Sequence, residues 1–425
     1  MIEPPRSRWL LAAARSAAVA AIWASPLAAS QTVDTTAQAF SQGRPDPRDG
    51  SVATVVPNLV SASVVATDIK SPLLQDVRLV VSGWGGATVG DPLNGKVGVG
   101  DLDIGYLQSD SRYLVLRLGR QFLVGGVTRG LQLDGAFAGL LFPSSFGLDA
   151  YGGVPVAPIF GAAKGDAIGG GRFYWRPSFG TEVGASFVEL FDRGIVGRQD
   201  AGVDARWAAR ADLVLQGSAL FSLIEQRLEE GEAMVTYTPF RALLLELDWR
   251  RVAPDLYISR ASLFSVFSEE RRDEAGGTAF VQLSPRLSAN AECHLLWMPE
   301  GTAQRAALEL RYRLGPDGAT QVALEGRLLD TPMNGYVQAR AYLTHRVPSS
   351  LFVTVESDAY FFLQPINGHT AAYTATLTAG YDILPAWRVT LAAAGGSTPF
   401  LQWDLQYIAK LTWTPRFKLG PKEKS

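Results

Sequence analysis

Charged and apolar residues alternate along residues 305–314, where the sequence reads R-A-A-L-E-L-R-Y-R-L. Leu308 and Leu310 fall on one parity, whereas Glu309 and Arg311 fall on the other. An α-helix would scatter these charges around its circumference, but a β-strand directs alternate side chains to opposite faces. The stretch therefore predicts a strand with one apolar face and one ionic face.

The same alternation returns in residues 286–297, 320–328, 351–361 and 401–413. A soluble sheet shows this pattern once or twice, with its polar face in water. Repetition through most of a chain is typical of a closed sheet with lipid outside and water inside. We therefore expect an all-β fold, a closed antiparallel transmembrane β-barrel.

The strands between residues 76 and 414 number about 18, and a range of 16–20 covers the ambiguous segment 122–167. Short connections that carry proline alternate with longer ones at 123–129, 156–167 and 251–276. Short turns at one rim and long loops at the other are typical of bacterial outer-membrane barrels. A barrel of this size is too wide for side chains to fill, which predicts a water-filled lumen.

Residues 1–30 have the features of a signal peptide. Arg6 and Arg8 precede an apolar run, and small residues at 28–30 supply a cleavage site. The alternative is a membrane-anchoring helix, but Arg15 interrupts the run, which is shorter than the roughly 20 apolar residues that a span needs. Export predicts a location in the outer membrane of a Gram-negative bacterium.

The remaining chain divides into three predicted parts. Residues 31–72 lack sustained periodicity and predict a periplasmic lead-in, with room for one short strand near residues 59–67. Residues 73–417 predict the barrel, and residues 418–425 form a basic tail. Pro415 cannot continue a ladder of hydrogen bonds, so either Trp413 or, after a break, Phe417 is the terminal aromatic residue of the barrel.

Composition argues against several classes of function. The single cysteine, Cys293, excludes an intramolecular disulfide, and a net charge of −2 argues against nucleic acid as a partner. No metal-ligand spacing and no phosphate-binding loop are present, so we expect no cofactor, no metal and no enzyme.

Glu292 and His294 share a face and could form an acid–base pair. A solvated pair in a channel wall is the preferred interpretation, because no nucleophile motif accompanies them.

The polar parity of the predicted strands supplies candidate residues for a pore wall. Both charge signs occur there, and arginine provides most of the cations. The candidates are Glu246, Asp248, Arg250, Arg305, Glu309, Arg311, Arg313, Glu325, Arg327, Arg340, Glu356 and Asp358.

Two roles are open for these candidates. Arginine side chains donate paired hydrogen bonds to carboxylates, sulfates and sugar hydroxyls, which favours contact with a solute. Arginine–glutamate pairs can instead brace neighbouring strands. We expect Arg305, Arg311, Arg313, Arg327 and Arg340 to contribute to solute contact.

A strand reading L-R-L-G-R-Q is followed by R-G-L-Q-L-D-G. This pattern resembles outer-membrane porins and alginate-export-type barrels, in which a G-R-Q strand precedes a strand that contains D-G. The matching positions are Gly119, Arg120, Gln121, Arg129, Asp134 and Gly135. The likeness covers about 40 residues and implies a barrel superfamily rather than a solute. In architecture the chain is also similar to barrels that work with a periplasmic polysaccharide-export protein.

These features predict an outer-membrane channel for saccharide-like polar solutes. The most specific form of this hypothesis is export of a polysaccharide with the help of a periplasmic export protein. A passive or substrate-selective uptake porin is the first alternative. An outer-membrane enzyme or an adhesin is the second.

Overall fold

The computed structural model describes residues 31–45, 54–69, 71, 74–89, 98–126, 131–156, 165–252, 272–315, 318–347, 350–400 and 404–419. The predicted signal peptide (residues 1–30), Arg129 and residues 420–425 of the basic tail lie outside the described residues. No helix among these residues is long and apolar enough to cross a membrane.

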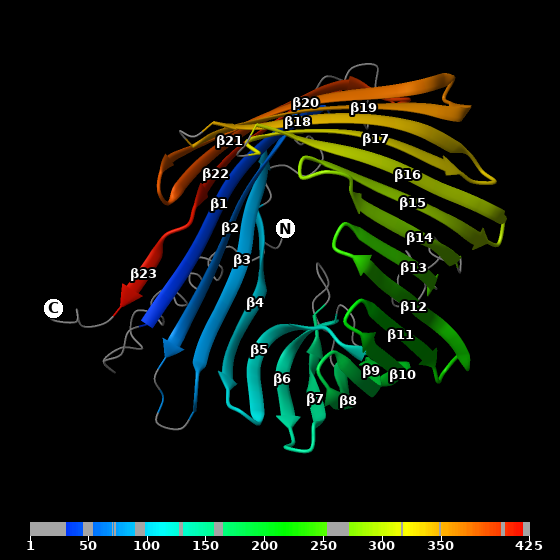
Figure 1. Cartoon of the computed structure of the whole chain (residues 1–425). Coiled ribbons are helices and arrows are strands. Elements are labelled where there is room, and N and C mark those ends of the chain that lie inside the picture. The colour runs from blue at the N-terminus through cyan, green and yellow to red at the C-terminus, as the bar shows by residue number, and fades with distance from the viewer. Residues whose placement is uncertain are drawn as a thin grey trace.

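Every regular element is a β-strand, and Figure 1 shows the strands as one continuous curved wall. The strands are β1 (Gln31–Pro45), β2 (Thr54–Ile69), β3 (Val77–Val89), β4 (Gly98–Asp110), β5 (Leu114–Leu123), β6 (Leu131–Leu141), β7 (Phe146–Pro155), β8 (Ala167–Ser178), β9 (Thr181–Asp192), β10 (Ile195–Arg210), β11 (Leu213–Ser222), β12 (Arg227–Phe240), β13 (Leu243–Val252), β14 (Arg272–Gln282), β15 (Leu287–Met298), β16 (Gly301–Leu314), β17 (Thr320–Asp330), β18 (Gly335–Val347), β19 (Leu351–Ile366), β20 (His369–Leu384), β21 (Trp387–Ser397), β22 (Asp404–Trp413) and β23 (Arg416–Leu419).

The sheet closes on itself. Each strand from β1 to β22 pairs antiparallel with the next, and β22 returns to β1 in a register that runs from Ala37↔Trp413 to Gly43↔Tyr407. Strand β23 pairs with residues 31–34 of β1, in line with β22 after the break at Pro415. The wall therefore contains 22 strands around its circumference and leaves no free edge.

The prediction of an all-β closed antiparallel barrel is confirmed, but the strand number of about 18 (range 16–20) is wrong. Strands β3–β22 lie between residues 76 and 414, and β1 and β2 come from residues 31–72. In β1 and β2 most polar positions carry serine, threonine or glutamine, and few carry a charge, as in V-S-A-S-V-V at residues 60–65. Strands β7 and β8 are rich in glycine. Both features weaken the alternation that identifies a strand.

The two rims of the barrel differ. One rim, called the turn rim, holds the start of β1 and the end of β22. It also holds the connections that follow even-numbered strands, such as residues 179–180, 211–212, 241–242 and 385–386. The opposite rim, called the loop rim, holds the longer connections at residues 46–53, 90–97, 156–166 and 253–271. In bacterial barrels the short turns face the periplasm and the long loops face outward.

The two faces of the wall also differ. Large apolar side chains such as Leu247 (65% exposed), Leu308 (50%) and Leu377 (53%) cover one parity, as expected of a surface in contact with lipid. The other parity is the inner face of the closed barrel. Near the loop rim the inner face carries a buried apolar cluster of Leu123, Leu133, Ile168, Val188 and Leu220. This cluster stiffens the wall on the inner side of β5–β11.

Candidate functional site

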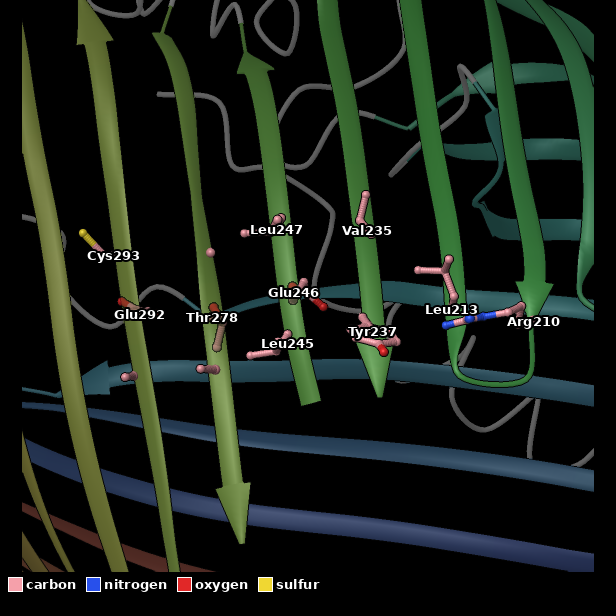
Figure 2. Close-up of a pocket in the computed structure, with 13 residues that line it drawn as sticks. Arg210, Leu213, Val235, Tyr237, Leu245, Glu246, Leu247, Thr278, Glu292 and Cys293 are labelled. Atoms are coloured by element: carbon pink, nitrogen blue, oxygen red, sulfur yellow. The ribbon is translucent and has the colours of Figure 1, made fainter. Parts of the chain in front are cut away.

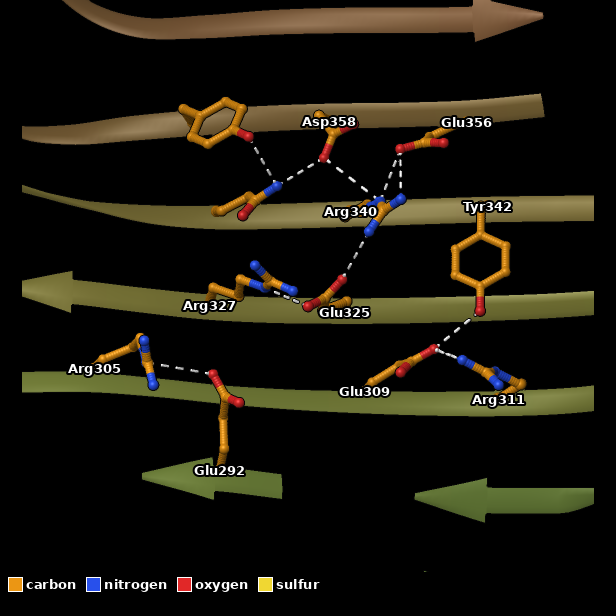
Figure 3. Close-up of polar contacts among 12 residues, drawn as sticks. Glu292, Arg305, Glu309, Arg311, Glu325, Arg327, Arg340, Tyr342, Glu356 and Asp358 are labelled. Carbon is orange, nitrogen blue, oxygen red and sulfur yellow. Dashed lines mark hydrogen bonds and ion pairs between the residues drawn. The ribbon is translucent and has the colours of Figure 1, made fainter. Parts of the chain in front are cut away.

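The pairing register gathers nine of the twelve candidate residues on the inner face of β16–β19. Glu309 lies opposite Glu325, Glu325 opposite Arg340, and Arg340 opposite Asp358, so one row of charges crosses four strands. Figure 3 shows this set, apart from Arg313, as a patch of neighbouring side chains in separate groups: one around Arg340, one at Glu309 and Arg311, and Arg305 with Glu292. Arg340 has a carboxylate opposite it on each neighbouring strand, which is a favourable cross-strand arrangement. Glu309 and Glu325 are like charges, and each is paired with an arginine of its own strand.

Arg340 is the centre of the patch. Its guanidinium contacts Glu356 Oε1 at 2.7 Å and Glu325 Oε2 at 3.3 Å, and its Nε lies 3.9 Å from Asp358 Oδ1. Asp358 also accepts a hydrogen bond from the Nε2 of Gln338 at 2.7 Å. One fork-shaped cation thus joins three carboxylates from β17 and β19.

Two further arginines bind carboxylates on their own strands. Arg327 pairs with Glu325. Arg311 donates from Nη2 to Glu309 Oε1 at 2.8 Å, and the Tyr342 hydroxyl donates to the same oxygen at 2.9 Å. The side chains of Arg327 and Arg311 remain 48% and 43% exposed, so both can contact a solute while they are paired.

Arg305 extends the patch toward the loop rim. Its Nη2 lies 2.6 Å from Glu274 Oε1, and its Nε lies 3.7 Å from Glu292 Oε1. His294, two residues from Glu292, instead contacts Asp248 Oδ1 through Nε2 at 3.0 Å. Glu292 and His294 thus have separate partners, which removes the geometric basis for an acid–base pair between them.

The three candidates on β13 behave differently from those on β16–β19. Asp248 is held by His294, whereas Glu246 and Arg250 have no ion pair with any described residue. Arg313, near the turn rim end of β16, also has none in the described part of the chain. Most charges on this side of the barrel are therefore neutralised by a neighbour, and a few are not.

The neighbouring sector of the inner face, from β20 round to β3, carries hydroxyl groups that were not predicted from the sequence. Residues 371–379 contain no charge, and Thr374, Thr376 and Thr378 alternate there with Ala375 and Leu377. Such threonine–apolar alternation was the available signal. The hydroxyl-bearing inner positions from β20 round to β3 are Thr374, Thr376, Thr378, Thr390, Thr412, Thr36, Ser61, Ser63 and Ser82.

The described residues of the family-like pattern, which are all of its members except Arg129, come together on β5 and β6. Arg120 lies opposite Asp134 and binds it through two hydrogen bonds of 2.7 and 2.8 Å. Gln121 is fully buried, and Gly119 lies opposite Gly135. Gly119 has a φ of +123°, and a Cβ there would lie 2.1 Å from the Gly105 carbonyl oxygen, so only glycine fits. Arg120 shares its parity with the exposed Leu118 and Phe122, so this ion pair lies on the outer face.

A hollow of about 610 Å³ lies on the outer face of β11–β15 and is lined mostly by apolar side chains. Figure 2 shows Leu213, Val235 and Leu247 on neighbouring strands of this hollow, with Cys293 at one side. These residues belong to the parity that faces lipid. The hollow is therefore a furrow in the lipid-facing surface rather than a solute site.

Among solved structures, the chain is similar to outer-membrane barrels. The P pilus usher PapC translocation pore aligns with a TM-score of 0.50 and 10% identity, over 90% of this chain and 99% of that chain. OpdK of Pseudomonas aeruginosa aligns with a TM-score of 0.47 and 12% identity, over 91% and 99% of the two chains. OccAB3 of Acinetobacter baumannii aligns with a TM-score of 0.45 and 10% identity, over 91% and 99%. No family model and no curated protein matches the sequence.

At these identities the likeness shows the fold alone. Together with the closed 22-strand wall, its apolar outer face and its two unlike rims, it identifies an outer-membrane β-barrel protein of a Gram-negative bacterium. The turn rim accordingly faces the periplasm and the loop rim faces outward.

Proposed function

We propose that this protein is a passive channel through which small hydrophilic, saccharide-like solutes enter the periplasm. The observation that carries the proposal is the inner face, where an ion-paired sector on β16–β19 and an adjacent hydroxyl sector on β20–β3 line the same interior. Neutral and zwitterionic solutes find hydrogen-bond donors and acceptors there without a large net charge to overcome.

The size of the barrel supports a through-going lumen. With strands spaced by about 4.8 Å and tilted by about 40°, a circular wall of 22 strands would be roughly 40 Å across at the backbone. Side chains from opposite walls cannot meet over such a span.

Liposome swelling tests the proposal. Purified protein reconstituted into vesicles should admit neutral monosaccharides, which is seen as a fall in light scattering, and should admit a tetrasaccharide more slowly. Vesicles made with protein denatured by heat before reconstitution are the control. Vesicles that stay as tight as protein-free vesicles toward the monosaccharide would contradict the proposal.

A single substitution tests the role of the ion-paired sector. Arg340→Gln leaves Glu325, Glu356 and Asp358 without their shared cation and makes this sector more negative. We expect permeation of anionic sugars such as gluconate to fall relative to glucose. Arg340→Lys keeps the charge and should retain most of the anion permeation. Identical ratios in all three proteins would place Arg340 in a purely bracing role.

Export of a polysaccharide with a periplasmic partner is a second candidate, and the 22-strand circumference favours it because a sugar polymer needs a wide passage. A deletion strain separates the two functions. Slower uptake of a nutrient with normal surface polymer supports the uptake channel. Loss of surface polymer with unchanged uptake supports the exporter.

A further inference from the structure

Four exposed arginines lie on consecutive hairpins at the turn rim. Arg241 is in the β12–β13 turn, Arg286 in the β14–β15 turn, Arg313 near the end of β16 and Arg346 near the end of β18. We call these four residues the basic arc. Backbone hydrogen bonds join the neighbouring connections directly, as in Arg313 N to Arg286 O at 2.8 Å.

The basic arc lacks the carboxylate partners found elsewhere in the barrel. None of its four side chains forms an ion pair with another described residue. Its flanks are paired, since Arg210 binds Asp212 and Arg388 binds Asp382. Arg346 is close enough to Asp382 to act on it electrostatically, but Arg388 occupies that carboxylate with two hydrogen bonds of 2.6 and 3.0 Å.

Arginines near the opposite rim are arranged otherwise. Arg251 binds Asp273 at 2.6 Å, Arg227 binds Glu225 at 2.6 Å, and Arg305 binds Glu274 at 2.6 Å. Among the described arginines of the β12–β19 sector, those without an ion pair are thus concentrated at the turn rim, and Arg250 on β13 is the exception near the loop rim. Successive hairpins are about 10 Å apart along the sheet, comparable to the Debye length of about 8 Å at physiological salt, so the fields of the four arginines overlap.

The direction of the side chains favours a solute over a lipid. Tyr312 and Leu343 are among the exposed residues of the outer face. Arg313 is one residue from Tyr312 and Arg346 is three residues from Leu343, so both arginines lie on the inner parity. Arg241 and Arg286 lie in the turns that border the same mouth. Lipid headgroups meet the outer face, whereas anything that passes through the barrel meets the inner face. Guanidinium forks bind carboxylate, phosphate and sulfate groups.

We propose that the basic arc is a binding site for solutes that carry several oxyanion groups, placed at the periplasmic mouth and absent from the outer mouth. The inference rests on the proposed function in one respect, namely that the lumen opens at this rim. It makes the two ends of the channel different, so that multiply charged anions bind from the periplasmic side only.

The test uses a planar bilayer with the full barrel inserted in one orientation and inositol hexakisphosphate as the probe. The probe should reduce the current when added at the turn rim side and have little effect from the loop rim side. In the quadruple variant with Gln at positions 241, 286, 313 and 346, we expect the half-blocking concentration to rise by about tenfold or more, since four screened contacts are lost. Arg227→Gln, at the loop rim, should block like the unmodified protein.

Calorimetry on detergent-solubilised barrel measures binding of the same probe without any current. Binding that is lost in the quadruple Gln variant and kept in the quadruple Lys variant supports the basic arc even if no conductance is seen, in which case only the proposed channel function fails. Binding unchanged by the Gln substitutions, or block of equal strength from both sides, would overturn the inference. Reduced binding of the Gln variant to phosphatidylglycerol vesicles, with unchanged probe binding, would assign the arginines to lipid instead.

Discussion

At the scale of single residues, the side-chain parity of each strand decides what a substitution costs. Leu377 and Thr376 are adjacent at the middle of β20, but Leu377 is 53% exposed on the outer face and Thr376 lies opposite Glu356 on the inner face. Leu377→Arg places a cation in hydrocarbon and should lower the free energy of unfolding by about 2–4 kcal/mol. Thr376→Arg gains a carboxylate neighbour and should be tolerated.

Urea unfolding from lipid vesicles, followed by tryptophan fluorescence, measures both variants. Comparable losses of stability in the two proteins would show that the faces of β20 are assigned incorrectly.

Two glycines provide a second matched pair. Gly119 has a φ of +123° and no room for a Cβ, whereas a Cβ at Gly326 on β17 would meet no atom within 4 Å. Gly119→Ala should therefore destabilise the barrel by at least about 1–3 kcal/mol through backbone strain. Gly326→Ala should be neutral or slightly stabilising, because it restricts the unfolded chain. The same unfolding assay applies, and equal stability of the two variants would refute the strain at Gly119.

At the scale of elements, closure depends on β22 more than on β23. Strand β22 pairs with β1 over residues 37–43, and Trp413 stacks on Trp387 with ring centroids 5.5 Å apart. Strand β23 adds pairs only with residues 31–34. Both terminal aromatic positions considered from the sequence, Trp413 and Phe417, thus lie in strands that pair with β1.

Truncation tests this division. Protein ending at Pro415 should still refold in vitro into a form that migrates differently before and after boiling, because the wall remains closed. Protein ending at Phe400 lacks β22 and should lose this heat-modifiable form. A heat-modifiable barrel without β22, or its loss on removal of β23 alone, would contradict the account of closure.

The strongly ionic strands could be recognised from the sequence, and the others could not. In β16–β19 most inner positions carry a charge or a large polar group, with Ala307 and Ala323 among the exceptions, so the alternation is easily recognised. In β20 most inner positions carry hydroxyls, and in β1 and β2 the inner positions mix hydroxyls with amide, apolar and a few charged side chains, a pattern that is compatible with loops as well as strands. The strand number was underestimated for this reason.

The partners within the candidate site were also beyond the sequence. Spacing places Glu325 and Arg340 on the inner face, but only the register brings both to Glu356 and Asp358. The resemblance based on the G-R-Q strand indicated an outer-membrane barrel correctly. It gave no sign that Arg120 and Asp134 pair on the outer face, because that parity depends on strand ends that the sequence does not mark.

At the scale of the whole molecule, the proposed function requires that the 22 strands enclose an open, hydrophilic passage. The ion-paired and hydroxyl sectors supply its lining, and the basic arc gives it two unlike ends. Single-channel recording in planar bilayers tests this claim most directly. We predict discrete current steps of uniform size that grow with salt concentration and that heat-denatured protein does not produce. Correctly folded, heat-modifiable protein that inserts into the bilayer and leaves the current at the level of bare lipid would contradict it.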